Sequence, residues 1–109
     1  MANTFKLKTK ANVGVTTVGI YTAPAATTTV VIGITLANTS GSGVNVGVGI
    51  TRAGTTEDVK LLKNAPIPQG SSLEFMAGNK VVLETTDTVT VDSDTNNSVD
   101  AALTIMEIT

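Results

Sequence analysis

The chain has 109 residues, which is enough for one domain and too few for two ordinary ones. Its formal net charge is −2 and both signs are scattered, so it lacks the clustered Lys and Arg of a nucleic-acid-binding face. It contains no His and no Cys, which excludes zinc sites of the usual nitrogen and sulfur type and Ser-His-Asp or Cys-His catalytic triads. With one Tyr, two Phe and no Trp, the core must come from Val, Ile, Leu and Ala, and the abundant Val and Thr favour strands.

The first residues, 1–12, are predicted to form an N-terminal arm or an edge strand. Lys6, Lys8 and Lys10 alternate with apolar residues such as Phe5, and a period of two places the three ammonium groups on one face of a strand. We interpret this as a solvated or edge-protecting face, because Lys on an edge strand discourages unwanted pairing. Binding of an acidic partner is the less favoured alternative.

The next segments alternate clearly between apolar and polar residues. A strand is predicted over residues 13–22, followed by a turn and then by a strand over residues 29–38. A Gly- and Ser-rich link at residues 39–43 separates this strand from another over residues 44–51, so a β-hairpin is expected. The predicted apolar faces are Val30, Ile32, Ile34 and Leu36 in the first strand and Val44, Val46, Val48 and Ile50 in the second.

Gly47 and Gly49 share the opposite face of the second of these strands. Glycine weakens the interior of a strand and therefore needs a reason. One explanation is the close approach of another backbone, within the domain or from a neighbouring subunit, which makes both residues candidates for a subunit contact. The other explanation, equally weighted, is a bulge or a bend.

Five more short strands are expected in the second half of the chain, at residues 58–63, 72–76, 81–83, 88–92 and 99–108. Residues 64–70 are predicted to be a loop, because Pro66 and Pro68 cannot donate to a central sheet ladder. A tight turn at residues 77–79 would pair the strands on either side of it. About eight or nine short strands predict an all-β, single-domain antiparallel β-sandwich, jelly-roll or Greek-key-like, over residues 1–109.

The last strand places Met106 and Ile108 on the face opposite to Leu103. These two residues are candidates for a subunit contact. The alternative, rated slightly higher, is that they cover a second layer within the same domain.

The carboxylates of the chain gather in predicted turns, as the pairs Glu57 and Asp58, Glu84 and Asp87, and Asp92 and Asp94. Turns collect Asp because its side chain caps nearby backbone, so we interpret the pairs as structural. The segment from Asp92 begins like a calcium loop, but position 97 is Asn rather than Gly and position 103 is Leu rather than Glu. We expect no catalytic, cofactor or metal site and therefore no enzyme.

No apolar run approaches the ~20 residues needed to cross a bilayer. The N-terminal residues lack the apolar middle of a secretory signal, which predicts a protein made and used without export by the general secretory route. Neither a membrane nor a nucleic acid is expected as a partner.

Several segments resemble small virion proteins of tailed phages, notably those infecting cyanobacteria and marine bacteria. The resemblance runs from about Val15 to the end and is carried by residues 20–24, 28–38, 59–74, 80–84 and 99–108. It implies a β-sandwich that is often oligomeric and that works as a capsid decoration (cement) protein. The favoured expectation is a homotrimer that contacts the major capsid protein or other virion proteins, located in the virion and assembled in the host cytoplasm.

Two alternatives remain open. The same resemblance is compatible with a neck, tail or fibre component of the particle. A carbohydrate-binding module is a third reading, but sugar faces stack on exposed aromatic rings, and Tyr21 is the chain's single Tyr, with no Trp beside it.

Overall fold

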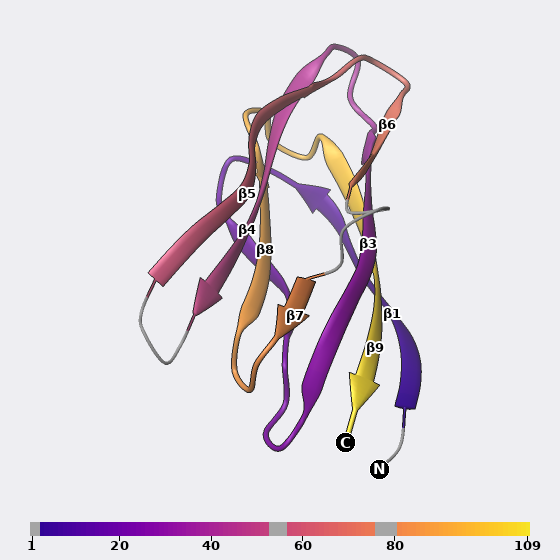
Figure 1. The fold of residues 1–109 in the computed structure, drawn as a ribbon. Helices are drawn as coiled ribbons and strands as arrows, with labels where there is room; N and C mark the ends of the chain where they lie inside the picture. Colours follow the sequence, from indigo (N-terminus) through magenta and orange to yellow (C-terminus); the bar gives the residue numbers. More distant parts are fainter. Residues whose placement is uncertain (1–2, 53–56, 76–80) are drawn as a thin grey trace.

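The computed structural model describes residues 3–52, 57–75 and 81–109 and shows nine antiparallel strands there, with no helix (Figure 1). No described segment is therefore a helix that could span a membrane. The strands are β1 (Asn3–Val13), β2 (Val18–Thr22), β3 (Thr28–Asn38), β4 (Val44–Arg52), β5 (Glu57–Ile67), β6 (Ser72–Phe75), β7 (Val81–Leu83), β8 (Thr88–Ser93) and β9 (Val99–Ile108). The predicted all-β antiparallel sandwich is confirmed.

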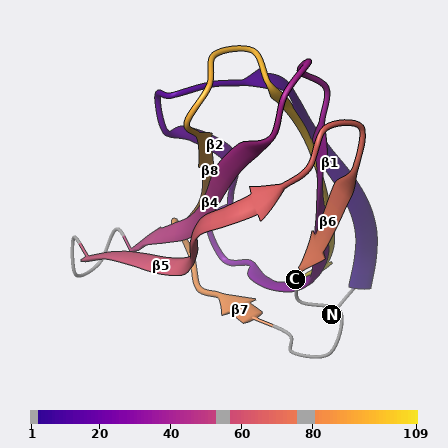
Figure 2. The ribbon, with the colours of Figure 1, turned by 90° about the horizontal axis from the view of Figure 1, so that it is seen from above.

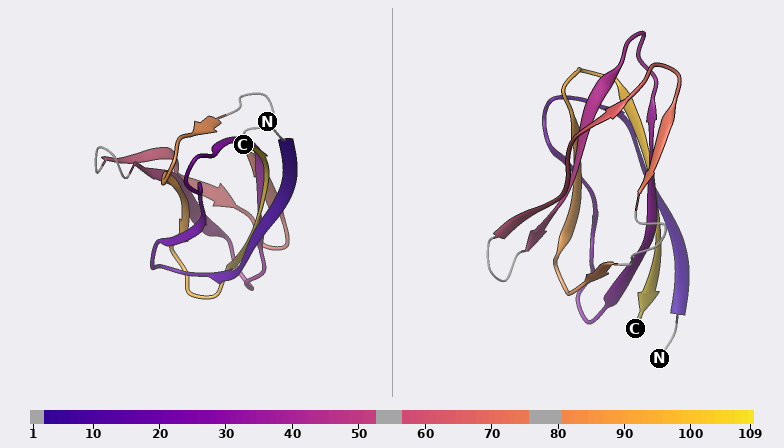
Figure 3. Two further views of the ribbon diagram at one scale, coloured as in Figure 1. Left: turned by 90° about the horizontal axis from the view of Figure 1, so that it is seen from below. Right: turned by 45° about the horizontal axis from the view of Figure 1, so that its top comes forward.

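The strands form two sheets that face each other as layers (Figures 2 and 3). The five-stranded sheet has the order β1-β9-β3-β6, and β7 pairs with β3 beside β6. The four-stranded sheet has the order β2-β8-β4-β5. When β6 and β7 are counted as one interrupted strand, this connectivity is that of a jelly roll, in which the chain crosses repeatedly between the two sheets.

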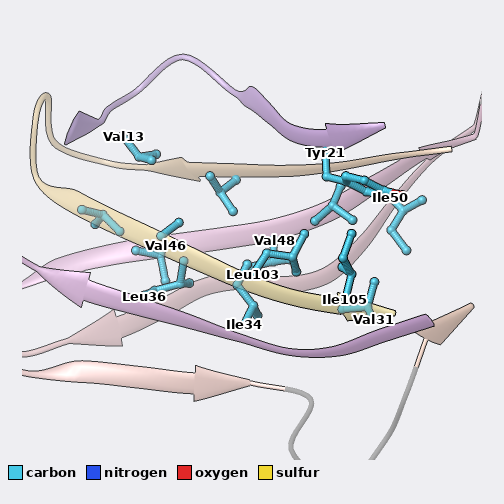
Figure 4. Close-up of a cluster of buried hydrophobic side chains, with 14 of the residues drawn as sticks. Val13, Tyr21, Val31, Ile34, Leu36, Val46, Val48, Ile50, Leu103 and Ile105 are labelled. Carbon is cyan, nitrogen blue, oxygen red and sulfur yellow. The ribbon is translucent and has the colours of Figure 1, made fainter. Parts of the chain in front are cut away.

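The core lies between the sheets and consists mainly of aliphatic side chains from both inner faces, with Tyr21 among them (Figure 4). Branched residues suit this site because they pack well on a pleated surface. The largest fully buried side chains are Val13, Val31, Ile34, Leu36, Val46, Val48, Ile67, Leu83, Val89, Val91, Leu103 and Ile105. The predicted apolar face of residues 44–50 is therefore confirmed, and β9 buries Val99, Ala101, Leu103 and Ile105 at the same period of two.

The predicted apolar face of β3 is wrong in its first half. Ile34 and Leu36 are buried as expected, but Val31 takes the core position that was predicted for Val30 and Ile32. The register with β9 shifts between Val31 and Gly33, which marks a β-bulge. One extra residue in a strand moves every preceding side chain to the other face.

The predicted hairpin between β3 and β4 is also wrong, because the two strands belong to different sheets. Both sides of β3 are already paired, one with β9 and the other with β6 and β7. The Gly- and Ser-rich link therefore crosses between layers. Buried Asn38 fixes the crossing, since its amide donates to the carbonyl oxygens of Ser42 at 2.8 Å and Ile67 at 3.0 Å.

Two strand boundaries and one strand pairing also differ from the sequence prediction. The strand expected over residues 13–22 is shorter than predicted: Val13 is the last residue of β1, and β2 begins at Val18. β5 continues to Ile67 through Pro66, where a loop was expected; a Pro is tolerated because β5 is an edge strand whose free side needs no donor. β7 pairs with β3 rather than with β6, and the tight turn predicted at residues 77–79 lies outside the described residues.

Candidate functional site

A row of apolar side chains crosses the outer face of the five-stranded sheet. Phe5 of β1 lies opposite Met106 of β9, Met106 lies opposite Val30 of β3, and Val30 lies opposite Val82 of β7. Directly opposed residues of antiparallel strands project from the same face of the sheet. We call these four residues the outer apolar row.

The ends of this row are strongly exposed. Phe5 has a relative exposure of 68% and Val82 of 58%, while Met106 and Val30 are half-buried. Leu7, two residues along β1 from Phe5, is 64% exposed and lies opposite Thr104 of β9. Large apolar side chains gathered on one exposed face are typical of a surface that binds another protein.

A shallow groove of about 310 Å³ continues the same face toward the other end of β1 and β9. Its lining consists mainly of small side chains, among them Thr9, Ala11, Thr35, Ala37 and Ala102. Small residues let a partner approach the backbone closely. The row and the groove together form one continuous candidate interface on the five-stranded sheet.

Met106 and Ile108 both lie on this outer face. Their side chains are half-buried, whereas Leu103, Ile105 and Glu107 point between the sheets and are buried. They therefore point away from the core that joins the two layers of the domain. Their contact with another subunit stays a prediction.

Gly47 and Gly49 lie on the outer face of the four-stranded sheet, and both are buried. A Cβ atom on Gly49 would lie 2.9 Å from the carbonyl oxygen of Val59, and one on Gly47 would lie 2.6 Å from a carboxylate oxygen of Asp92. The register of β4 with β5 also shifts between Val46 and Gly49. Both explanations for these glycines therefore apply within the domain: neighbouring strands approach β4 closely, and the β4–β5 pairing is irregular. A contact of Gly47 and Gly49 with a second subunit stays a prediction.

Glu107 is a buried carboxylate on the inner face of β9. It accepts a hydrogen bond from the Tyr21 hydroxyl at 2.6 Å and pairs with the Lys6 ammonium at 2.8 Å. Tyr21 also contacts the Thr29 hydroxyl at 2.7 Å. Hydrogen bonds from Lys6 and then Tyr21 lower the pKa of Glu107, while burial and then Glu107 raise the pKa of Tyr21 to about 12.

The sequence analysis did not identify Glu107. A signal was present, since Glu107 follows Leu103 and Ile105 at the same period of two on the inner face of β9. Its counter-ion could not be identified without the register of β1 and β9, in which Lys6 lies opposite Ile105 on that inner face. Lys6 therefore neutralises an acid of its own chain.

Tyr21 is unavailable to a sugar ligand. The residue is 7% exposed, its hydroxyl donates a hydrogen bond inside the domain, and the Lys8 ammonium lies 6.0 Å from the ring centroid. The residue on which a carbohydrate-binding function depended is thus part of the core, and the ring cannot serve as a stacking platform at the surface.

The carboxylates in the turns have structural partners. Glu84 and Asp87 both pair with Arg52, at 2.9 and 3.1 Å, and Asp87 also accepts the backbone N–H of Glu84. Asp58 accepts a hydrogen bond from Thr51. These contacts join the β7–β8 turn to β4, as expected of carboxylates that cap local backbone.

The calcium-like segment is held together by its own neighbours. Asp92 accepts a hydrogen bond from Thr17 at 2.9 Å, and Asp94 accepts the backbone N–H of Asn45 at 3.1 Å. The described residues contain no group of three or more acidic, His or Cys side chains arranged to hold a metal ion.

No protein-family model and no curated protein sequence matches the chain. Solved structures do share its fold. A chain from Bacillus endospore appendages, which form disulfide-linked pili, superposes with a TM-score of 0.57 at 17% identity, covering 99% of this chain and 87% of that chain. The VP2 subviral particle of infectious bursal disease virus superposes with a TM-score of 0.58 at 12% identity, covering 96% of this chain and 32% of that chain. The chain thus spans about a third of VP2, and at these identities the likeness shows the fold alone.

Proposed function

We propose that this chain is a structural subunit of a phage particle, and specifically a capsid decoration protein that stabilises the shell through protein–protein contacts. The observation that carries the proposal is the outer apolar row, with Phe5 and Leu7 largely exposed beside it. Support also comes from the resemblance of residues 20–24, 28–38, 59–74, 80–84 and 99–108 to phage virion proteins. The jelly roll is shared with a viral capsid subunit and with a pilus subunit, so the fold is compatible with assembly.

The face has the chemistry of a docking surface. Full burial of an exposed Phe or Leu side chain contributes roughly 1.5–3 kcal/mol each, so Phe5 and Leu7 alone supply a large part of a specific contact. Such contacts commonly bury about 800 Å² on each partner, and the groove beside the row extends the available area. Met106 and Ile108 would be covered in the same contact.

Repetition is part of this function. A shell presents many equivalent sites, and copies bound at local three-fold positions would lie close enough to contact each other as a homotrimer. Since the chain has no Cys, contacts between its copies would not include the disulfide links of the endospore pili.

The number of copies of this chain in a purified phage particle tests the proposal. Quantitative mass spectrometry should find on the order of hundreds of copies, because a decorated shell repeats one site over its surface. About a dozen or fewer copies would indicate a neck, tail or fibre component instead. The absence of the chain from purified particles would contradict a virion role altogether.

A further inference from the structure

The strand β1 is attached to the domain differently from the strands around it. Of its eleven residues, only Val13 at the end is buried and only Lys8 is half-buried. In the described part of the chain β1 lies at the edge of the five-stranded sheet and pairs with β9 alone (Figure 1). Residues 3–10 therefore contribute no fully buried side chain to the core and can leave without opening a cavity.

The edge of β9 that β1 occupies favours a strand with a positive charge near Glu107. The carboxylate of Glu107 is buried there, and the ammonium of Lys6 lies 2.8 Å from it. Removing the counter-ion of a buried carboxylate is strongly destabilising, so a strand that carries a cation at this register is favoured over one that does not. The sequence of β1 supplies this cation in Lys6, whether β1 comes from the same copy or from another.

A hinge lies between the arm and its anchor. Asn12 has a left-handed backbone, with φ of 58°, and the register with β9 shifts between Lys10 and Val13. Val13 itself is buried, and its carbonyl oxygen accepts the backbone N–H of Ser98 at 3.0 Å. A change of backbone conformation at residues 11–12 can redirect residues 3–10 while Val13 stays in the core.

We propose that β1 is an exchangeable arm, and that in the assembled protein residues 3–10 of one copy pair with β9 of a second copy. The occupant is a second copy because the site is complementary to β1 itself, in backbone pairing and in the match of Lys6 to Glu107. Exchange of an identical strand keeps every one of these contacts and changes only the hinge. Phe5 of one copy then completes the outer apolar row of the next.

This inference concerns how copies are linked, and it goes beyond the proposed function, because it holds for any assembly that the chain forms. It is tested with two engineered cysteines in a chain that has none of its own. Leu7 and Thr104 are exposed and directly opposed in register, so Leu7→Cys and Thr104→Cys come near disulfide distance wherever β1 lies on β9.

In the first experiment the two single variants are mixed, incubated and oxidised. Exchange predicts a covalent heterodimer, with a yield at least about tenfold above that of a control mixture of Leu7→Cys with Val82→Cys, because paired strands hold their cysteines at high effective concentration. Val82 is exposed on the same face but lies on β7, which pairs with β3. Equal yields in the two mixtures would overturn the proposal.

In the second experiment the Leu7→Cys/Thr104→Cys double variant is oxidised when dilute, which locks β1 onto its own β9. The reduced double variant carries the same two substitutions on the outer face, so it isolates the effect of the lock. Light scattering should show that the wild type and the reduced double variant form oligomers at high concentration and that the locked form stays monomeric. Oligomers of the locked form, or a wild type that is monomeric at every concentration, would overturn the proposal. Neither result depends on whether the chain is found in a phage particle.

Discussion

The substitution Gly49→Ala gives a direct test of how tightly the four-stranded sheet is built. Gly49 lies in β4 between β5 and β8, opposite Lys60 on one side and Thr90 on the other. A Cβ atom at this position would lie 2.9 Å from the carbonyl oxygen of Val59 and 3.2 Å from the hydroxyl oxygen of Thr90. The first of these atoms belongs to the backbone, so the added methyl group forces β5 to shift.

The size of the effect follows from two opposing contributions. Overpacking of this kind destabilises by typically about 1–3 kcal/mol. Replacing Gly by Ala also reduces the conformational freedom of the unfolded chain, and this offsets about 0.4–1 kcal/mol of the destabilisation. We therefore expect Gly49→Ala to lower the free energy of unfolding by about 1–2 kcal/mol, which corresponds to a melting temperature lower by about 4–10 °C in a domain of this size.

Thermal unfolding followed by circular dichroism measures this difference. Gly41→Ala is the matched control, because a Cβ atom there meets nothing within 4 Å, and it should melt at the wild-type temperature or slightly above. A Gly49→Ala protein as stable as the wild type would refute the close approach within the domain. If it also failed to form oligomers, the glycine would be required at a subunit contact instead.

Three further predictions concern the core and the buried acid. Leu103→Ala should lower the free energy of unfolding in urea by about 2–5 kcal/mol, since Leu103 is fully buried, whereas Thr104→Ala on the exposed face should change it by less than about 0.5 kcal/mol. Tyr21 is the single Tyr, so the ultraviolet absorbance of its phenolate should show a pKa of about 12 in the native protein and a lower pKa in Glu107→Gln. Because the pKa of Glu107 is lowered by folding, its contribution to stability is present above its ordinary value of 4.5 and is lost as the pH falls through the native value. Urea midpoints should accordingly fall less steeply with acid in Glu107→Gln than in the wild type.

These predictions have distinct contrary outcomes. Similar losses for Leu103→Ala and Thr104→Ala would mean that the two faces of β9 are assigned wrongly. A native Tyr21 that ionises at its ordinary pKa of 10 would mean that the ring is open to water. Parallel acid dependence of the wild type and Glu107→Gln would mean that Lys6 does not stabilise the buried carboxylate.

Alternation of side chains was enough to predict most of the strands and much of the core. The period of two between residues 44 and 50, and again between residues 99 and 105, identifies which side chains are buried because one face of each strand packs on the other sheet. The same pattern says nothing about which strands are neighbours. β3 and β4 are adjacent in the sequence and alternate equally well, yet β3 pairs with β9, 61 residues away when Asn38 is matched to Val99.

Local irregularities also escape a periodic pattern. The bulge at residues 31–33 depends on pairing with β9, and Pro66 is acceptable in a strand only because β5 lies at an edge. The candidate interface could not be predicted from the periodic pattern either. The period of two along β9 was enough to place Met106 on the face opposite to Leu103. The row that joins Met106 to Phe5, Val30 and Val82 depends on the register of four strands, which the pattern does not give.

The central claim is that the outer face of the five-stranded sheet is the surface by which this chain joins its assembly. The most direct test is the number of copies incorporated into phage particles by the double variant Phe5→Ser/Leu7→Ser, with Val15→Ser as the matched control. Val15 is 56% exposed but lies in the segment between β1 and β2, away from this face. We predict that all three proteins fold with similar melting temperatures, that Val15→Ser is incorporated like the wild type, and that the double variant is incorporated at least about tenfold less, since two buried apolar side chains are lost from the contact. Normal incorporation of a folded double variant would contradict the account.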